Sequence, residues 1–388
     1  MIKRTDANED WTLYDSMRGI TTGDDDIQFK INRDYDDITG IQRMSLIANG
    51  FKIVSNDGDI NQSGGNYVYT CIRRSDGYVG KPADAGTDVF DIEFGSGGSA
   101  NPAFIGGFPV DFAINRELYS SGTTNPTSAG NYTGARLTGQ SWLATHDNSS
   151  EQTGVTDWVF DSNTGWSKNY PSNYISWMWK RHAGMDVVTY KGDGVTTGRD
   201  IPHSCNSVPE MIWVKKRNSS TYTDWIVYHV GAGNTKYLRV SQNVAAATTI
   251  NTWNNTTPTA THFTIGQSPE ANNNGDDFIA MLFSSVDKIS KCGTYAGSSS
   301  DVTVTTGFQP RFIIIKRTNA ASHWAVYDTR RGINSSGSGG DYLLYTNDTN
   351  AQTEETHIDL SSTGFTVKTG AWVAINSDGN DYVYYAHA

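Results

Sequence analysis

An internal repeat is the feature of this sequence that most constrains its fold. The start of the chain recurs near its end at one constant offset, without a gap. The matched segments are Ile2–Thr5 with Ile315–Thr318, Trp11 with Trp324, Tyr14-Asp15 with Tyr327-Asp328, and Arg18-Gly19-Ile20 with Arg331-Gly332-Ile333. A third copy carries Val214-Lys215 followed by Trp225. Self-similarity of this kind indicates one structural unit used several times along the chain.

Further landmarks place the ends of the repeated units. Each copy closes on an aromatic segment of alternating character, and a Tyr-x-Gly motif opens the later ones. The closing segments begin at Tyr67, Tyr174, Phe278 and Tyr382, and the opening motifs are Tyr190-Lys191-Gly192 and Tyr295-Ala296-Gly297. We predict four modules, at residues 1–75, 76–182, 183–287 and 288–388. The first module starts in mid-repeat, and the second is the most divergent.

The composition favours an all-β fold for each module. The chain contains 39 Gly, 20 Tyr and 11 Trp, which suit tight turns and half-buried strands. Phe312–Ile315 is a continuous apolar run, as expected of a strand buried on both faces. We predict a tandem array of β-sandwich modules of roughly a hundred residues each. A propeller-like arrangement is the alternative, although propeller blades are only about half that length.

The tryptophans fall into two groups. Trp11, Trp225 and Trp324 recur at one repeat position, and Trp166 takes a recurring Phe position, so all four are predicted to lie in cores. Trp142, Trp253 and Trp372 have no counterparts in the other modules. In polar loops such aromatics can stack on sugar rings or pack against a partner, and we propose them as binding residues. Local packing within the loop is the alternative for each.

The charge pattern argues against two classes of partner. A net charge of −11 opposes binding to nucleic acid or to an anionic membrane. The basic clusters Lys215-Lys216-Arg217 and Lys316-Arg317 follow apolar runs, so we predict that they lie at solvated strand ends. No apolar run approaches the length that spans a bilayer, so membrane insertion is not expected.

Metal and cofactor sites have little support in the sequence. Asp57, Asp59 and Asn61 alternate as in a calcium loop, but Gln62 and Val68 stand where such a loop needs Gly and Glu. Turn formation explains these residues as well, and they remain weak calcium candidates. The three cysteines are far apart and have no metal-ligand spacing. We expect no cofactor.

Catalytic motifs are also missing from the sequence. It has no GxSxG elbow, HExxH pair, phosphate-binding loop or dinucleotide fingerprint. The histidines do not recur at equivalent module positions. The recurring Asp15-x-x-Arg18-Gly19 and Asp328-x-x-Arg331-Gly332 segments indicate a turn fixed by an Asp–Arg contact rather than a catalytic pair. We therefore expect a protein that is not an enzyme.

The shortened first module predicts an assembly contact. It begins at the strand of Ile2, Lys3 and Arg4 and lacks the motif that precedes this strand elsewhere. An incomplete sandwich leaves an unpaired sheet edge, which proteins normally cover. We predict that this edge lies at Ile2, Lys3 and Arg4 and is covered by another chain or by a neighbouring copy.

The repeat motifs resemble a poorly characterised β-repeat family of virion and tail-associated proteins from marine tailed bacteriophages. The resemblance is carried by four segments: Trp11–Gly19, Asn61–Tyr69, Gly307–Lys316 and Trp324–Gly332. It implies a virion structural protein, made and assembled in the host cytoplasm, with other virion proteins as partners. It also implies a homo-oligomer, and it supplies no catalytic residues.

On this basis we expect a protein of the tail-fibre or adhesin type. Its loops would attach to the host surface, with a glycan as the expected receptor. One alternative is a capsid-decoration or tail-structure protein that binds only other virion subunits. A more remote alternative is a depolymerase acting on envelope polysaccharide.

Overall fold

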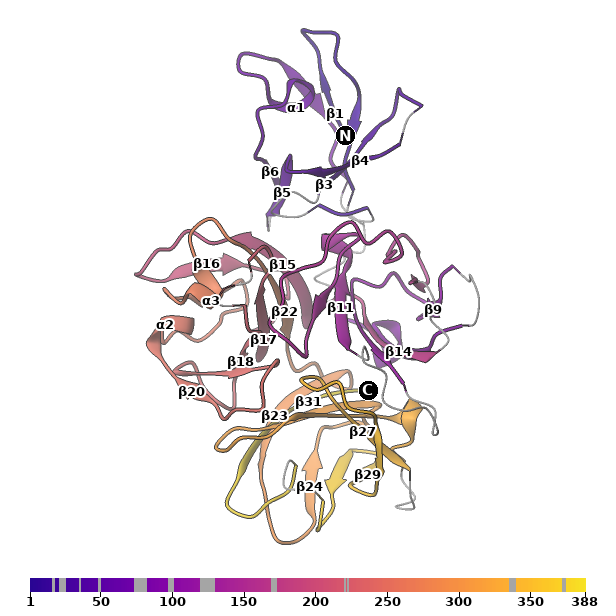
Figure 1. Ribbon diagram of the computed structural model, residues 1–388, viewed down its shortest axis with the longest axis vertical. Helices are drawn as coiled ribbons and strands as arrows, with labels where there is room; N and C mark the ends of the chain where they lie inside the picture. The colour runs from indigo at the N-terminus through magenta and orange to yellow at the C-terminus, as the bar shows by residue number, and fades with distance from the viewer. Residues whose placement is uncertain are drawn as a thin grey trace.

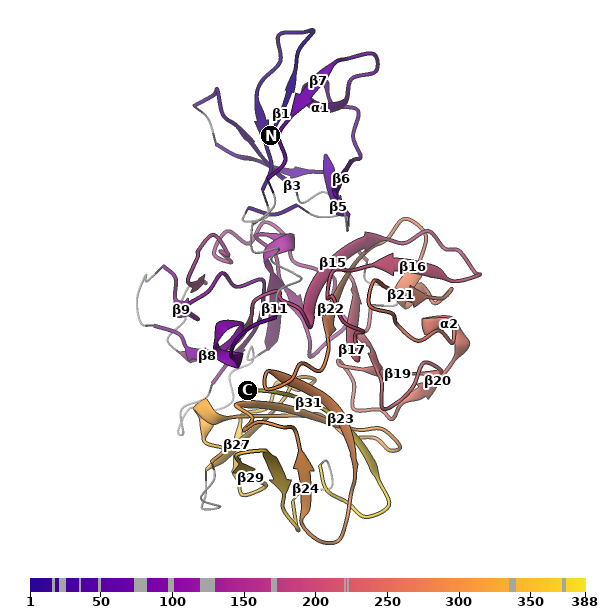
Figure 2. The ribbon, with the colours of Figure 1, turned by 180° about the vertical axis from the view of Figure 1, so that it is seen from behind.

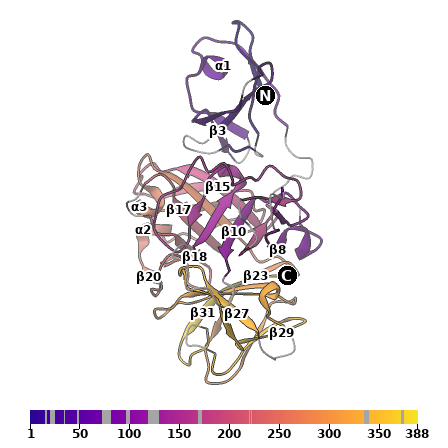
Figure 3. The ribbon, with the colours of Figure 1, turned by 45° about the vertical axis from the view of Figure 1, so that its right-hand side comes forward.

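The computed structural model shows an all-β protein built from four modules (Figures 1 and 2). It describes residues 1–15, 18–20, 26–34, 36–47, 50–72, 82–96, 101–118, 130–168, 173–219, 221, 223–334, 340–371 and 375–388. The second, third and fourth modules surround a common centre, and the first module stands apart from this three-module body (Figure 3). Each module contains two antiparallel sheets packed as a sandwich, which confirms the predicted fold class.

The third module shows the arrangement that the others share. Its large sheet has the order β15-β22-β17-β18-β19-β20, and β16 pairs with β21 in the smaller sheet. The bounds are β15 (Met185–Lys191), β16 (Arg199–Pro202), β17 (Met211–Lys216), β18 (Ile226–His229), β19 (Lys236–Arg239), β20 (Ala247–Thr248), α2 (Ile250–Trp253), β21 (His262–Ile265), α3 (Pro269–Asn272) and β22 (Asp277–Phe283). The opening strand β15 therefore pairs with the closing strand β22.

The fourth module repeats this topology. Its large sheet has the order β23-β31-β25-β26-β27-β28, and the smaller sheet is β24-β30-β29. The bounds are β23 (Ser290–Ala296), β24 (Val302–Thr305), β25 (Phe312–Arg317), β26 (Trp324–Asp328), η4 (Thr329–Arg331), β27 (Asp341–Tyr345), β28 (Thr353–Glu355), β29 (Ile358–Ser361), β30 (Gly364–Val367) and β31 (Asp381–His387).

The second module keeps the same order despite its divergent sequence. Its large sheet runs β12-β11-β10-β14-β8, and β9 pairs with β13. The bounds are η1 (Gly86–Asp88), β8 (Phe90–Phe94), β9 (Phe104–Ile105), β10 (Phe112–Glu117), β11 (Asn131–Ala135), η2 (Arg136–Thr138), β12 (Leu143–Ala144), β13 (Gly165–Trp166) and β14 (Tyr174–Trp179). The predicted module boundaries near residues 183 and 288 lie between a closing and an opening strand, and the boundary near residue 76 lies outside the described residues.

The described residues of the first module form the same sheet without an opening strand. The order is β4-β3-β2-β1-β7, with β5 and β6 as a separate hairpin. The bounds are β1 (Ile2–Arg4), β2 (Thr12–Leu13), β3 (Asp26–Lys30), β4 (Ile38–Ile41), β5 (Met44–Ile47), β6 (Gly50–Ile53), α1 (Gly58–Asn61) and β7 (Tyr67–Tyr69).

The predicted assembly edge at Ile2, Lys3 and Arg4 is wrong. These residues form β1, which pairs with β2 on one side and with β7 on the other. The opening strand of every other module pairs with the closing strand, so its absence exposes β7 rather than β1. Within the described residues, β7 pairs with β1 alone.

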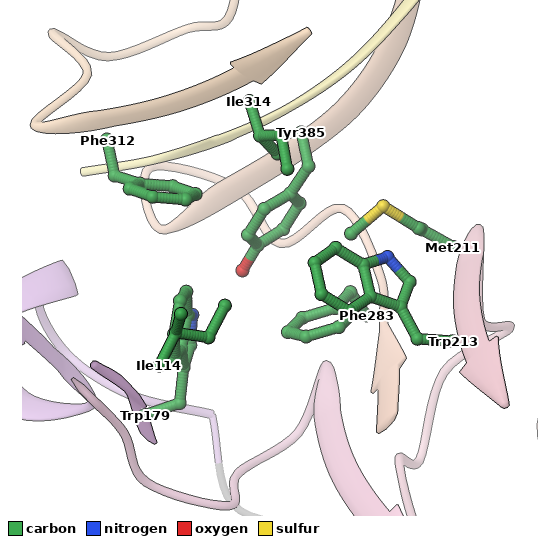
Figure 4. Close-up of a pocket in the computed structure, with 8 residues that line it drawn as sticks. All are labelled: Ile114, Trp179, Met211, Trp213, Phe283, Phe312, Ile314 and Tyr385. Carbon is green, nitrogen blue, oxygen red and sulfur yellow. The ribbon is translucent and has the colours of Figure 1, made fainter. Parts of the chain in front are cut away.

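A central core joins the second, third and fourth modules. Their large sheets are buried on both faces: in β25, Phe312 and Ile314 point to the centre, whereas Ile313 and Ile315 point into the module's own sandwich. The prediction of a strand buried on both faces is confirmed. Figure 4 shows the side chains that meet at this centre around a small cavity with room for about one water molecule. They are Ile114, Trp179, Met211, Trp213, Phe283, Phe312, Ile314 and Tyr385.

Hydrogen bonds connect the three modules in a cycle. The indole Nε1 of Trp225 donates to the Ala144 carbonyl oxygen at 2.6 Å, and that of Trp324 donates to the Arg239 carbonyl oxygen at 2.7 Å. In the second module Asn131 takes the tryptophan position. Its Nδ2 donates to the Tyr345 carbonyl oxygen at 2.8 Å and completes the cycle.

The three acceptors occupy one equivalent position. Each lies opposite the residue that follows the donor of its own module: Ala144 opposite Tyr132, Arg239 opposite Ile226, and Tyr345 opposite Ala325. The contact therefore passes from third module to second, from fourth to third and from second to fourth. The three modules are therefore related by approximate threefold symmetry within a single chain.

The recurring tryptophans meet expectation in three cases out of four. Trp166, Trp225 and Trp324 are at most 1% exposed, as predicted for core residues. Trp11 is 37% exposed, so the prediction is wrong for the first module. The reason is that the repeat position of Trp11 is buried by a neighbouring module, and the first module has no such neighbour.

The recurring Asp–Arg turn is confirmed. Asp328 accepts hydrogen bonds from the backbone nitrogen and the Nε of Arg331, at 2.9 and 2.7 Å. In the first module Arg18 makes the equivalent backbone bond and ion pair to Asp15. Asp328 also accepts from the indole of Trp177 in the second module at 3.0 Å, so this turn contributes to the contact between modules.

Four of the five residues of the basic clusters are buried and Arg317 is half-buried, contrary to the prediction of solvated strand ends. Lys215, Lys216, Arg217 and Lys316 are at most 1% exposed. Lys316 donates to the Ser322 carbonyl, and Arg217 pairs with Glu151 of the second module at 2.7 Å. Because the large sheets are covered on both faces, basic side chains at the end of a central strand remain inside the body.

The burial of Lys316 predicts a pH-dependent stability. Desolvation and nearby Arg317 lower the pKa of Lys316 from 10.5 to about 7. Between these values the unfolded chain holds a proton that the folded chain lacks, so this lysine makes folding more favourable as the pH rises. We expect the stability difference between the native protein and Lys316→Met to change by about 1.4 kcal/mol per pH unit in this window.

Chemical denaturation of both proteins at several alkaline pH values measures this difference. Comparing the two proteins cancels the other titrating groups, and Lys236→Met, at an exposed lysine, is the matched control. A difference that stays constant with pH would show that Lys316 is charged in the folded protein.

Candidate functional site

The second module replaces part of its sandwich core with a polar and aromatic cluster. Cross-strand pairing sets the cluster: Asn115 on β10 lies opposite Tyr132 on β11 and Ser176 on β14, and Glu117 lies opposite Tyr174. These positions alternate with the residues that face the central core, so they face the module's own smaller sheet. We call this group the Lys168 cluster. It comprises Asn115, Glu117, Tyr132, Trp142, Lys168 and Tyr174.

Lys168 lies at the centre of this group. Its Nζ is 3.5 Å from the centroid of the Tyr174 ring and 3.5 Å from Oδ1 of Asn115. The Tyr174 hydroxyl lies 3.5 Å from a carboxylate oxygen of Glu117. A lysine over an aromatic face is held by the quadrupole of the ring, an interaction that strengthens as water is removed.

Burial perturbs the titration of the cluster. Desolvation lowers the pKa of Lys168 to about 8, although the charges of Asp157 and Glu117 act in the opposite direction. Desolvation, with a contribution from Glu117, raises the pKa of Tyr174 to about 12. The pKa of Tyr132 is also raised, again mainly by desolvation. Groups shifted by both burial and a neighbouring charge are concentrated at functional sites.

Trp142 forms the outer part of the cluster. Its ring packs edge-on against Tyr132, with ring centroids 4.7 Å apart, and Tyr132 also contacts His146. Tyr132, Trp142 and Tyr174 are half-buried against the apolar part of the sandwich core. Their rings therefore combine a fixed position with partial access to solvent.

The other modules have ordinary apolar residues at these positions. Lys168 corresponds to Ile265 and Val367, and both are fully buried. The counterparts of the remaining cluster residues are Val214 and Ile315 for Asn115, Ile226 and Ala325 for Tyr132, and Phe278 and Tyr382 for Tyr174. All of these are at most 1% exposed. The repeat thus folds with an apolar core here, so packing alone does not require the polar side chains of the second module.

The cluster has the chemistry of a binding site for a polar, ring-containing ligand. Half-buried aromatic faces supply apolar contact, while the Glu117 carboxylate and the Lys168 ammonium supply oriented hydrogen-bond groups. Sugars present both kinds of surface. The described residues also contain no group of three or more His, Cys, Asp or Glu side chains placed to hold a metal ion.

The predicted binding residues have three different outcomes. Trp142 lies in the Lys168 cluster. Trp253 belongs to α2, is 1% exposed and packs against Tyr228, so its proposed binding role is wrong and local packing explains it. Trp372 lies outside the described residues.

The calcium candidates have partners within the protein. Asp57 caps α1 by accepting from the backbone nitrogen of Asp59, and it pairs with Arg43 at 2.6 Å. Asp59 pairs with Lys30, and the side chain of Asn61 donates to the Ser55 carbonyl at 2.8 Å. These contacts explain the three residues as a helix cap with its ion pairs.

Sequence reasoning missed most of the Lys168 cluster. A signal was present, because Lys168 follows Gly165-Trp166 at a repeat position where the third and fourth modules carry Ile265 and Val367. The alignment of repeats is weakest between residues 84 and 150, and Asn115 and Tyr132 lie in that stretch. Their pairing across the sheet became visible only in the structure.

A family model covers most of the chain. It matches residues 1–75 and 114–388, which include all the residues of the cluster. The chain belongs to the family of the domain of unknown function DUF7483. No curated protein matches the chain. Among the described residues, no helix has the length and apolar character needed to cross a membrane.

The position of Lys168 in this DUF7483 protein predicts an unusual stability effect. Replacing a buried charge with an apolar side chain often stabilises a protein when packing has not selected that charge. We expect Lys168→Met to raise the free energy of unfolding by about 1 kcal/mol near neutral pH. Chemical denaturation measures the change.

The matched control introduces a lysine at the equivalent position of the third module. Ile265→Lys is expected to destabilise the protein, because the site there is wholly apolar. If Lys168→Met is destabilising as well, the lysine is a structural part of the second module's core.

Proposed function

We propose that this protein is a bacteriophage virion structural protein of the tail-fibre or adhesin type that attaches to a host-surface glycan through the Lys168 cluster. The observation that carries the proposal is the replacement of an apolar core by Asn115, Tyr132, Lys168 and Tyr174 in one module of a repeat. Departures from local folding rules are typical of functional sites.

The surrounding body suits an attachment role. Its three modules share one core and are joined by hydrogen bonds and by the Arg217–Glu151 ion pair. A binding site on sheets held in this way changes shape little, which lowers the entropic cost of binding. The virion assignment itself rests on the resemblance of the repeat motifs to phage virion proteins.

The ligand class follows from the side chains. Trp142, Tyr132 and Tyr174 offer aromatic surface, and Glu117 and Lys168 offer hydrogen-bond groups, while the fully buried Asn115 holds Lys168 in place. A ligand with apolar ring faces and hydroxyl groups matches both, as envelope polysaccharides do. Lys168 also favours a glycan that carries acidic groups, since a partly desolvated ammonium gains from an added anion.

Binding to purified host envelope glycan tests the site. Trp142→Ala and Tyr174→Ala are each expected to weaken binding roughly tenfold or more, measured by calorimetry or by retention on immobilised glycan. Tyr342→Ala is the matched control, since Tyr342 is also half-buried but lies in the fourth module. Equal binding by all three variants would contradict the proposed site.

The location on the particle tests the virion assignment separately. An antibody to this chain, viewed by electron microscopy, is expected to label the tail or its fibres. Label on the capsid lattice would instead support a decoration protein. Release of sugar from the glycan by the purified chain would replace the adhesin with a depolymerase.

A further inference from the structure

The first module exposes the sheet face that the other three modules bury. Val68 on the closing strand β7 pairs with Lys3, as Val383 pairs with Lys316 in the fourth module. Val383 is 1% exposed in the central core, and its counterparts Ile175 and Ile279 are equally buried. Val68 is 50% exposed. The same repeat position is thus covered by neighbours in three modules and left open in one.

Trp11 shows the same contrast. It is the counterpart of Trp225 and Trp324, whose indole N–H groups donate to a carbonyl of the adjacent module. The backbone nitrogen of Trp11 donates to Asn32, as that of Trp324 donates to Asn347, so the local geometry is conserved between the modules. No indole partner of Trp11 occurs in the described part of the chain.

The acceptor for such a bond is also present in the first module. Lys30 lies opposite Thr12, the residue after Trp11, as Tyr345 lies opposite Ala325 after Trp324. Lys30 is therefore the counterpart of Ala144, Arg239 and Tyr345, whose carbonyls accept from a neighbouring module. Its side chain forms ion pairs with Asp10 and Asp59. Its carbonyl oxygen accepts a hydrogen bond from the backbone nitrogen of Arg33 at 3.1 Å, and its second lone pair is available for the contact between copies.

The open face carries exposed apolar side chains from several strands. Met1 and Trp11 are each 37% exposed, and Ile72, beyond the end of β7, is 89% exposed. Leu13 is half-buried between them. Contiguous exposed apolar side chains of this kind mark an interface with another protein.

We propose that three copies of this chain associate through the first module, repeating between copies the packing that the other three modules adopt within one chain. Trp11 of each copy would donate to the Lys30 carbonyl of the next, and Val68, Leu13 and Met1 would meet at the axis. Within the three-module body each module donates to one neighbour and accepts from the other, so the same contact between copies is head-to-tail and closes as a ring. Within the chain, three modules close the same contact into a cycle, so we expect three copies.

Two further copies of this chain therefore cover the open face of the first module. This conclusion follows from the internal packing of the molecule and does not depend on the proposed glycan site. A twofold dimer would place two Trp11–Lys30 contacts across a single interface, whereas each interface of the three-module body carries one contact of this kind.

Analytical ultracentrifugation of the full chain tests the proposal at micromolar concentration. We expect a trimer, and we expect Trp11→Arg and Val68→Arg each to convert it to a monomer. Ile105→Arg is the matched control, because Ile105 is 58% exposed on β9 of the second module, away from the face. A native chain that sediments as a monomer or a dimer would overturn the proposal, as would a trimer that survives both substitutions.

Photo-crosslinking covers the case in which these variants fail to fold. A photoreactive phenylalanine analogue at position 11, in a mixture of isotopically light and heavy chains, is expected to link to the β3 segment around Lys30 of a different copy. Links confined to a single chain, or links between copies at another segment, would overturn the proposal. Glycan binding by a monomeric Val68→Arg chain then reports on the Lys168 cluster independently of assembly.

Discussion

Burial of the large sheets on both faces is the constraint on which the rest of this structure depends. A single sandwich module buries one face of each sheet, and its second face must find a neighbour. In three modules the neighbour is another module, and the resulting core combines side chains such as Trp179, Trp213 and Tyr385 from different parts of the chain. The buried lysines at the strand ends, the tryptophan–carbonyl cycle and the exposed face of the first module all follow from this arrangement.

The sequence predicted what depends on local pattern. Alternating aromatic strands, the Asp328–Arg331 turn and the repeat offsets lead to all-β modules with closing strands where the structure has them. Even the unusual run Phe312–Ile315 correctly indicated burial on both faces. These features are local because strand periodicity and turn chemistry are properties of a few neighbouring residues.

The features that the sequence did not predict are those that depend on which modules pack against each other. Trp11 and Trp324 have the same local context, but one is exposed and the other is buried by the third module. Lys316 was expected in solvent for the same reason. The local sequence shows that it lies at the end of a strand, but it does not show that another module packs over that end. The edge at Ile2 was assigned wrongly because the pairing of opening with closing strands links segments about a hundred residues apart, beyond any local pattern. Trp253 failed as a binding residue because α2 turns its ring into the core.

Covalent linkage of the three modules has a consequence for how each contact can evolve. In an assembly of identical subunits, a substitution at the donor position appears at every interface at once. Here each interface has its own residues, and Asn131 stands where the other two modules have tryptophan. The asparagine reaches three carbonyls on the fourth module, at Tyr345, Thr346 and Asp348. One interface can thus exchange aromatic bulk for a hydrogen-bond network while the other two keep their packing, which lets the second module acquire residues that a strictly symmetric ring would exclude.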